Sequence, residues 1–292
     1  MTRPAEAFGQ PLIDVLISAL MFVVNLMPDV FSDPFQYGFM QRALLTSVVV
    51  GAVCGLLSSY VILKRWSLLG DAISHAVLPG VAIAYLLGWP FFVGAFITGA
   101  LTSLGIGFIE RHSRIKSDAA MGLMFTAAFA LGVVIISQIT TSTHLMHILF
   151  GNVLGVRHSA LLLTLFSGVL VLVVIALFYK PLLLYVFDPV QARSLGMNTR
   201  LIHYGLMLLL TLTIVASLET VGIILVVSML ITPGATAYLL VNRLPAMMVL
   251  STLIGAISSV LGLYLAFRFN VASGGAIVLV VTAFFALAFL FA

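Results

Sequence analysis

Asp71 and His75 are the residues whose types and spacing point most directly to chemistry. They lie four residues apart in the stretch Gly70–Gly80, so on a helix both side chains share one face. A carboxylate oxygen with an imidazole nitrogen suits Mn²⁺, Fe²⁺ or Zn²⁺, whereas Cu⁺ prefers sulfur. An ionisable group in an apolar span costs about 2.5–3.5 kcal/mol at the helix centre and by default marks a pathway or site. The pair is a candidate metal site; alternatively, Asp71 caps the helix and His75 bonds a neighbouring helix.

Three further residues are candidate gate residues, namely Pro79, Glu219 and Pro233. Proline cannot continue the helical hydrogen-bond ladder, so Pro79 frees carbonyl groups near the Asp–His pair. The Pro-Gly pair at Pro79 occurs again at Pro233. This similarity reflects either an inverted repeat of broken helices or chance. Glu219 falls where two predicted helices meet on the outer side. It is either a carboxylate at the entry gate or a charged residue at the membrane interface.

His144 and His147 lie three residues apart in an outer segment, so they either receive metal or are solvated loop histidines. We interpret His112 and His203, which fall near helix ends on the inner side, as interfacial residues.

The composition places these residues in a membrane. Of the 292 residues 62% are hydrophobic and 8% are charged, whereas a soluble domain has about 25% charged residues. Apolar runs of about 20 residues recur, each long enough to cross a hydrocarbon core of about 30 Å. We therefore predict an all-α integral membrane protein, a polytopic bundle of about 8–10 transmembrane helices. The single cysteine, Cys54, excludes an intrachain disulfide.

The predicted spans follow the apolar runs, and the second is short and interrupted at Pro79. An N-terminal stretch, residues 12–27, either spans the membrane or lies in the interface, and Asp14 and Asn25 favour the interface. The predicted spans are Ala43–Leu63, Ala72–Leu87, Phe91–Ile109, Ala119–Ser137, Ala160–Tyr179, Leu201–Leu218, Val221–Val241, Ala246–Phe267 and Gly275–Phe291. Gly51 and Gly55 fit the small-residue spacing of a close helix contact.

Basic residues set the orientation. If the first span runs from outside to inside, only Arg42, Arg157 and Arg268 fall outside, and Arg3 depends on the N-terminal stretch. Cytoplasmic loops carry an excess of Lys and Arg, so this direction is the expected one. The residues on the cytoplasmic side are then Lys64, Arg65, Arg111, Arg114, Lys116, Lys180, Arg193, Arg200 and Arg243. The net charge of +4 thus reports orientation and gives no indication of nucleic-acid binding.

Absent motifs exclude several enzyme classes. Lys64, Lys116 and Lys180 do not follow glycine, so the chain has no Walker A loop and does not itself hydrolyse ATP in that way. It has no H-E-x-x-H motif, which argues against a zinc protease. We therefore expect a protein that is not an enzyme by its own residues.

The chain resembles the permease subunits of bacterial ABC importers for manganese, zinc and iron, from about Pro34 to its C-terminus. Three ordered motifs carry this resemblance: Ser67–Gly80 with its GDAISH core, Val221–Ile223 together with Leu230–Ala237, and His147–Asn152. The sequence Ala-Val-Leu-Pro-Gly at 76–80 resembles the manganese and iron branch of this family more than the zinc branch.

The resemblance implies a type II, vitamin B12-importer-like permease in the bacterial cytoplasmic membrane. It implies a homodimer, two cytoplasmic ATPase subunits that bind ATP, and an external or periplasmic metal-binding protein that delivers the ion. It further implies that Asp71 and His75 bind the transported metal, Mn²⁺ above all, in the channel. The permease domain would span residues 34–292 after an N-terminal extension, residues 1–33. A coupling helix would lie at about 187–198, with Asp188, Ala192 and Gly196 matching the family pattern after Phe187.

Two other classes remain open at this point. A secondary transporter driven by an ion gradient should carry several intramembrane carboxylates, but only Asp71 and marginally Glu219 qualify. A structural membrane subunit leaves the Asp–His pair unexplained. The sequence leaves the choice among Mn²⁺, Fe²⁺ and Zn²⁺ open.

Overall fold

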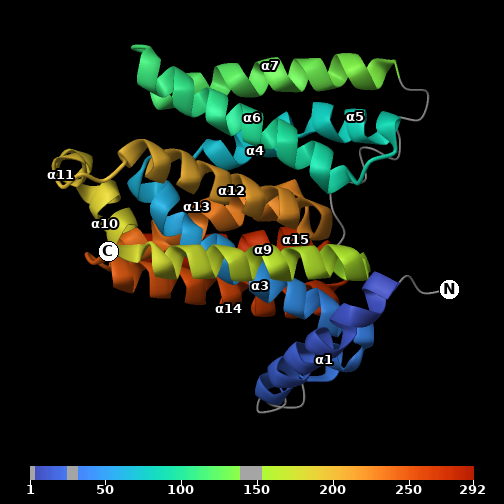
Figure 1. The fold of residues 1–292 in the computed structure, drawn as a ribbon. Coiled ribbons are helices and arrows are strands. Elements are labelled where there is room, and N and C mark those ends of the chain that lie inside the picture. Colours follow the sequence, from blue (N-terminus) through green and yellow to red (C-terminus); the bar gives the residue numbers. More distant parts are fainter. Residues whose placement is uncertain (1–3, 25–31, 139–152) are drawn as a thin grey trace.

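The computed structural model describes residues 4–24, 32–138 and 153–292 as a bundle of helices (Figure 1). No strand occurs in these ranges. The long helices of the bundle are α3 (Gly38–Leu63), α6 (Phe91–His112), α7 (Ser117–Ser137), α9 (His158–Leu177), α12 (Thr199–Val221), α13 (Ile223–Leu240), α14 (Leu244–Phe269) and α15 (Ser273–Phe291). The other elements are α1 (Pro4–Val24), η1 (Asp33–Gln36), α4 (Leu69–Ala76), α5 (Leu78–Leu87), η2 (Val153–Gly155), α10 (Tyr179–Phe187) and α11 (Pro189–Ser194).

Nine membrane-spanning segments are present in the described part of the chain, with α4 and α5 together forming one of them. Each is long and apolar enough to cross a bilayer. They coincide with the nine predicted spans, although α3 begins five residues earlier than expected, at Gly38 in place of Ala43. The predicted helical membrane bundle is therefore confirmed.

The most enclosed spans are α3 and the α4–α5 pair, and the least enclosed are α7 and α15. In Figure 1, α5, α6 and α7 form one layer, and α3, α9, α14 and α15 lie on the other side of α12 and α13. The helices α6 and α12 pack against each other along the seam between these two parts. Both also contact α4, which is thus held in the interior of the bundle.

Small residues allow the central helices to approach closely, as Gly51 and Gly55 predicted. A Cβ atom at Gly51 would collide with the carbonyl oxygen of Gly255, and one at Gly55 with that of Ser251. Both partners belong to α14, so α3 and α14 cross nearly backbone to backbone. The hydroxyl groups of Ser59 and Ser251 are 2.9 Å apart and add a hydrogen bond to this contact.

The interruption predicted at Pro79 lies two residues earlier, at Val77 between α4 and α5. Pro79 occupies the first turn of α5, where the missing N–H group would have no helical partner in any case. Pro233, in contrast, lies inside α13, which continues without a break. Ser58 of α3 supports the backbone there, because its hydroxyl donates to the Ile231 carbonyl at 3.1 Å and accepts from the Gly234 N–H at 2.8 Å. The two Pro-Gly steps therefore have different local structures.

The N-terminal helix α1 is not among the candidate spans of the described chain, and only Ile13–Phe22 within it is apolar. It packs against α3 and α9. Ile13 is buried beside Leu45, Leu161 and Leu165, so the helix is attached to the bundle by apolar contact. Whether it lies in the interface, as Asp14 favours, stays a prediction.

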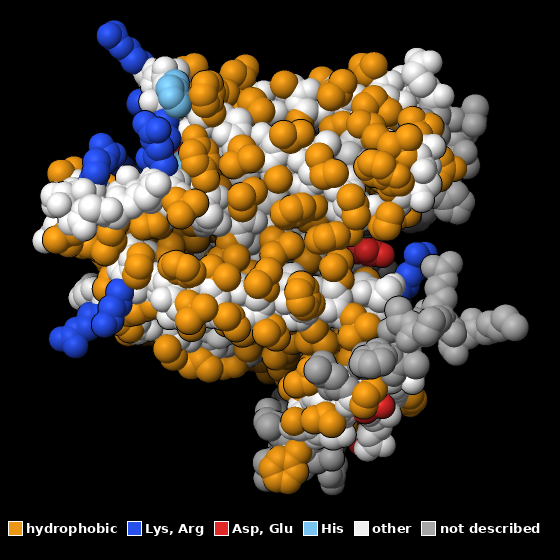
Figure 2. All heavy atoms as spheres, in the orientation of Figure 1, with side chains coloured by type: hydrophobic (Ala, Val, Ile, Leu, Met, Phe, Trp, Pro, Cys, Tyr) orange, Lys and Arg blue, Asp and Glu red, His pale blue; other side chains and the backbone are white. Residues whose placement is uncertain are grey.

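Charged side chains gather at one end of the bundle. Figure 2 shows hydrophobic side chains over its flanks and most of the Lys and Arg side chains at the end where α11 and the C-terminus lie in Figure 1. The end of α6, with Arg111, and the start of α12, with Arg200, belong to this end. The segregation fits the predicted sidedness, with this end in the cytoplasm.

Candidate functional site

The short helix α4 presents Asp71 and His75 on a single face. The Nε2 atom of His75 lies 3.5 Å from Oδ1 of Asp71. The hydroxyl of Ser74 is turned inward and donates to the Gly70 carbonyl at 2.8 Å. Every residue of α4 other than Asp71 and His75 is buried, while the side chains of these two are 49% and 33% exposed. The helix therefore directs only its two potential ligands away from the packed interior.

The alternative interpretation of the sequence, in which Asp71 caps the helix, does not fit its position. It lies in the first turn of α4 after Leu68, which occupies the N-cap position, and no side chain caps this helix. A carboxylate in the first turn still interacts favourably with the helix dipole. On the neighbouring helix α7, His75 contacts two aromatic side chains. The centre of the His75 ring lies 5.4 Å from that of Phe125 and 5.7 Å from that of Phe129.

Two donor atoms 3.5 Å apart can bind one ion, since protein oxygen and nitrogen ligands bind such metals at about 2.0–2.2 Å. Within the described ranges, no group of three or more His, Cys, Asp or Glu side chains could hold a metal. One chain therefore offers at most the Asp71 and His75 side chains as ligands to an ion at this place. An ion bound by this pair would need water, backbone carbonyls or a second chain to complete its coordination.

The predicted coupling segment, residues 187–198, contains the short helix α11 between two turns. Asp188 caps α11, since its carboxylate accepts hydrogen bonds from the backbone N–H groups of Val190 at 3.0 Å and Gln191 at 2.8 Å. Pro189 follows at the first helical position, where proline is favoured. Phe187 ends α10, and Ala192 is fully buried and fixes α11 to the rest of the chain.

Gly196 ends this helical turn in a left-handed conformation with φ of +79°. The Met197 N–H donates to the Ala192 carbonyl and the Gly196 N–H to the Arg193 carbonyl, both at 3.1 Å. This is the pattern of a helix end that requires glycine or asparagine. The three residues that match the family pattern thus have distinct structural roles in α11. Asp188 caps its start, Ala192 packs it against the chain, and Gly196 ends it.

Three large apolar side chains of this segment are exposed. Val190 is 78% exposed, Leu195 64% and Phe187 58%. These side chains lie at the charged end of the bundle, where α11 projects from it (Figure 1). Exposed apolar groups at such a site are typical of a surface that another protein covers.

The candidate gate residues are distributed over two places. Glu219, near the outer end of α12, lines a small cavity of about 20 Å³ together with Val77 and Val81, which flank Pro79 in the sequence. Pro79 itself is buried against α7, since a Cβ atom at Gly132 would contact it at 3.0 Å. Pro233 is buried on α13, where Ser58 of α3 supports the neighbouring backbone. The other two candidate metal residues of the sequence, His144 and His147, lie outside the described residues.

The sequence interpretation missed a buried polar cluster at the charged end of the bundle. His203 is buried and lies 3.8 Å from Glu110, so it is more than an interfacial residue. Its Nδ1 atom is 2.8 Å from the hydroxyl of Tyr185, and Trp66 packs edge-on against its ring at 5.3 Å. Ser117 donates a hydrogen bond to Glu110. The signal in the sequence was a carboxylate at the end of an apolar run, Glu110.

Two groups of this cluster lie outside the membrane-spanning segments. The ammonium of Lys64 lies 3.9 Å from the centre of the Tyr185 ring. Burial lowers the pKa of Lys64 from its ordinary value of 10.5, and the carboxylate of Glu110 opposes this shift. Burial raises the pKa of the Tyr185 hydroxyl to about 12, so it keeps its proton at neutral pH. The cluster thus joins α3, α6, α7, α10 and α12 next to the coupling segment.

The nine spans of the described residues and the one-sided basic end define a multi-pass integral membrane protein. The chain belongs to the ABC 3 transport family, whose model matches residues 36–292. It is thus a permease of an ABC transport system in the bacterial inner membrane. The assignment decides between the classes left open by the sequence, against a gradient-driven secondary transporter.

Curated relatives cover most of the chain. The manganese transport system membrane protein MntC of Listeria innocua is 57% identical over 88% of this chain and 92% of its own length. The chelated iron transport system membrane protein YfeD of Yersinia pestis is 45% identical over 92% of this chain and 90% of its own length.

Two solved structures resemble the fold. PsaBC from Streptococcus pneumoniae, in complex with a Fab, has a TM-score of 0.79 and 47% identity over 89% of this chain and 94% of that chain. An inward-facing metal-chelate type ABC transporter has a TM-score of 0.72 at 15% identity, over 99% of this chain and all of that one. The second likeness supports the fold alone.

Proposed function

We propose that this permease imports Mn²⁺ into the cytoplasm, with Fe²⁺ and Zn²⁺ as competing ions, along a path that includes Asp71 and His75. The observation that carries the proposal is that α4 exposes only these two side chains, 3.5 Å apart. The names of the relatives, which include manganese and iron transport proteins, support a metal ion of this kind as the transported substrate. The ion would exchange part of its water shell for a carboxylate and an imidazole and then leave, because a site in a transport path must bind weakly.

The proposal includes a homodimer. An exposed Asp–His pair on a membrane helix is costly in lipid, so its face should meet protein or a water-filled path. Two copies related by a two-fold axis would bring two such pairs together and supply four protein ligands to one ion. This arrangement accounts for a metal site that is incomplete in a single chain.

ATP would be bound and hydrolysed by a separate cytoplasmic ATPase dimer that docks on residues 187–198. The capped helix α11 and the exposed side chains of Phe187, Val190 and Leu195 support this assignment. The chain needs no resident cofactor in this scheme. An external metal-binding protein would deliver the ion at the opposite end.

The remaining segments have supporting roles in the proposal. Glu219 would attract the incoming cation near the outer end of α12, next to the start of α5 with Pro79. The Pro-Gly step at Pro233 would allow α13 to bend during the cycle. Residues 1–33 form an extension of the permease domain, residues 34–292, and α1 would lie in the membrane interface.

Uptake of radioactive manganese tests the cargo. The permease, its ATPase and its binding protein are expressed together in a strain that lacks native metal importers. We expect uptake that excess unlabelled Mn²⁺ suppresses most strongly, Fe²⁺ and Zn²⁺ less so. Stronger suppression by Zn²⁺ than by Mn²⁺ would reassign the cargo, and uptake without the ATPase would contradict the ATP-driven mechanism.

A further inference from the structure

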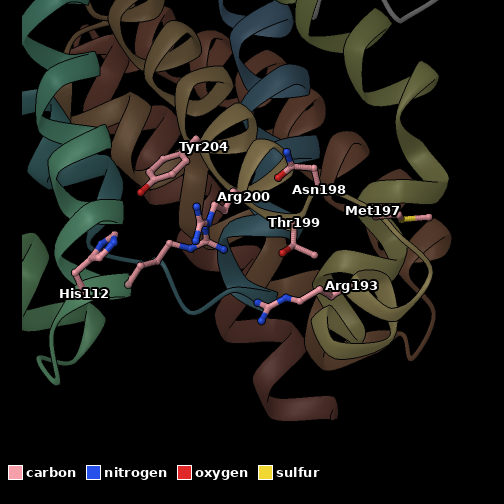
Figure 3. Close-up of a pocket in the computed structure, with 8 residues that line it drawn as sticks. His112, Arg193, Met197, Asn198, Thr199, Arg200 and Tyr204 are labelled. Atoms are coloured by element: carbon pink, nitrogen blue, oxygen red, sulfur yellow. The ribbon is translucent and has the colours of Figure 1, made fainter.

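A basic cavity of about 680 Å³ opens at the cytoplasmic end, between the end of α6 and the turn from α11 to α12. Figure 3 shows Arg200 between His112 of α6 and Arg193 of α11. The lining residues are Arg111, His112, Arg193, Met197, Asn198, Thr199, Arg200 and Tyr204. We use the term basic cavity for this set of residues.

No arginine of the basic cavity forms an ion pair within the described part of the chain. The close contacts found there between a carboxylate and a basic side chain are His75–Asp71 and His203–Glu110, and neither involves an arginine. The Nη1 atom of Arg111 is buried and has no hydrogen-bond partner among the described residues. Its guanidinium lies 5.8 Å from the centre of the Tyr204 ring. Several unpaired guanidinium groups in a concave site attract an anion, and carboxylates match their fork of N–H donors.

The position of the basic cavity favours a protein carboxylate as its occupant. Arg193 and Met197 belong to the coupling segment, whose Val190 and Leu195 are exposed. A subunit that covers these apolar side chains would also reach the cavity entrance, so both features would belong to one interface. Arg193 and Arg200 are themselves exposed and can contact a partner without any rearrangement of the bundle.

We propose that the basic cavity receives an acidic side chain of the cytoplasmic ATPase subunit. The proposal rests on the proposed function and adds a second contact to α11. The cavity is lined from α6 by Arg111 and His112 and from α12 by Arg200 and Tyr204, and both helices pack against α4. A carboxylate bound there would connect movement of the ATPase to the helices that flank Asp71 and His75, whereas α11 alone would reach them only through its connecting turns.

Zero-length cross-linking in the assembled complex tests the proposal. Arg200→Lys keeps the charge and introduces an amine that a carbodiimide joins to a carboxylate in direct contact. We expect mass spectrometry to find an amide bond between residue 200 and an Asp or Glu of the ATPase. Arg114→Lys is the matched control, because Arg114 is exposed at the same end but does not line the cavity. Cross-linking at residue 200 no greater than at residue 114 would overturn the proposal.

Charge reversal gives a second measurement in nanodiscs made only of zwitterionic lipid. We expect Arg200→Glu to weaken ATPase binding roughly tenfold or more, with a smaller salt dependence than the unaltered chain, and Arg114→Glu to have little effect. An effect of Arg200→Glu that appears only when anionic lipid is present would assign the cavity to lipid headgroups and overturn the proposal.

Failure of the proposed function has a different signature. Val190→Asp changes the exposed apolar surface of α11 without touching the basic cavity. If Val190→Asp leaves ATPase binding intact, the coupling assignment itself is wrong. If Val190→Asp abolishes binding while Arg200→Glu does not alter it, only the inference about the cavity is wrong.

Discussion

The Nε2 atom of His203 on α12 lies 3.8 Å from a carboxylate oxygen of Glu110 on α6, and their side chains are only 7% and 14% exposed. The other carboxylate oxygen accepts the hydrogen bond of Ser117 at the start of α7. Tyr185 of α10 completes the connection at 2.8 Å from the imidazole. A buried polar cluster of this kind is stabilising only while each member keeps its partners. It therefore holds four helix ends in a fixed arrangement beside the coupling segment.

Glu110→Ala should destabilise the protein by about 1–3 kcal/mol, because it removes the hydrogen bond of Ser117 and the carboxylate beside the buried His203. The thermal unfolding midpoint of the detergent-solubilised permease is the measurement. Asp118→Ala is the matched control, since Asp118 is an exposed acidic residue at the same end of α7. Equal midpoints for the two variants would show that the cluster has no structural role.

Gly80→Ala should also destabilise the fold, by about 1–3 kcal/mol, because its Cβ atom would collide with the carbonyl oxygen of Gly94 on α6. The contact between α5 and α6 would have to widen next to the break at Val77. Gly122→Ala on α7 is the control, as a Cβ atom there meets nothing within 4 Å. We expect a lower unfolding midpoint for the first variant alone, and an unchanged one would refute the close approach.

Gly196→Val should reduce the coupling of ATP hydrolysis to transport, because a β-branched residue is strained at φ of +79° and α11 would end differently. Gly196→Asn should be tolerated much better, since asparagine adopts this conformation more readily. The ratio of metal transported to ATP hydrolysed in proteoliposomes distinguishes them. There is open space around the position, so a steric clash within the chain does not explain a difference. Full coupling in the valine variant would argue against a role for this helix end.

Arg193→Cys should react with a membrane-impermeant thiol reagent only from the cytoplasmic side, and Arg157→Cys only from the outside. The two positions lie at opposite ends of the bundle, at α11 and at the start of α9. Cys54 is buried and should contribute little background. Labelling of both variants from a single side would contradict the predicted topology.

The spans and the Asp–His pair could be predicted from the sequence because their signals are local. Runs of about 20 apolar residues and a spacing of four residues depend only on helix geometry. The small-residue pattern at Gly51 and Gly55 predicted a close contact, but the sequence did not identify α14 as the partner. The docking role of residues 187–198 stays a prediction, and the left-handed conformation of Gly196 that ends α11 could be seen only in the structure.

The cytoplasmic cluster could not be predicted, because its members come from helices far apart in the sequence. Nothing in the spacing of Glu110 and His203 indicates that they meet, and each alone resembles a residue at a membrane interface. The helix break that we predicted at Pro79 lies at Val77 in the structure. A proline is compatible with the first turn of a helix, so the interruption precedes it at Val77.

The most direct test of the account is metal uptake by Asp71→Asn, His75→Ala and the double variant, each normalised to the amount of assembled permease–ATPase complex. We expect each single variant to lose most of its uptake, because the ligands that remain, one from each chain, cannot offset the dehydration of the ion. The double variant should be no worse, since two ligands of one site act together. A structural role predicts instead lower expression or thermal stability with unchanged normalised uptake. Normal uptake per assembled complex in either single variant would contradict the assignment of Asp71 and His75 to the metal path.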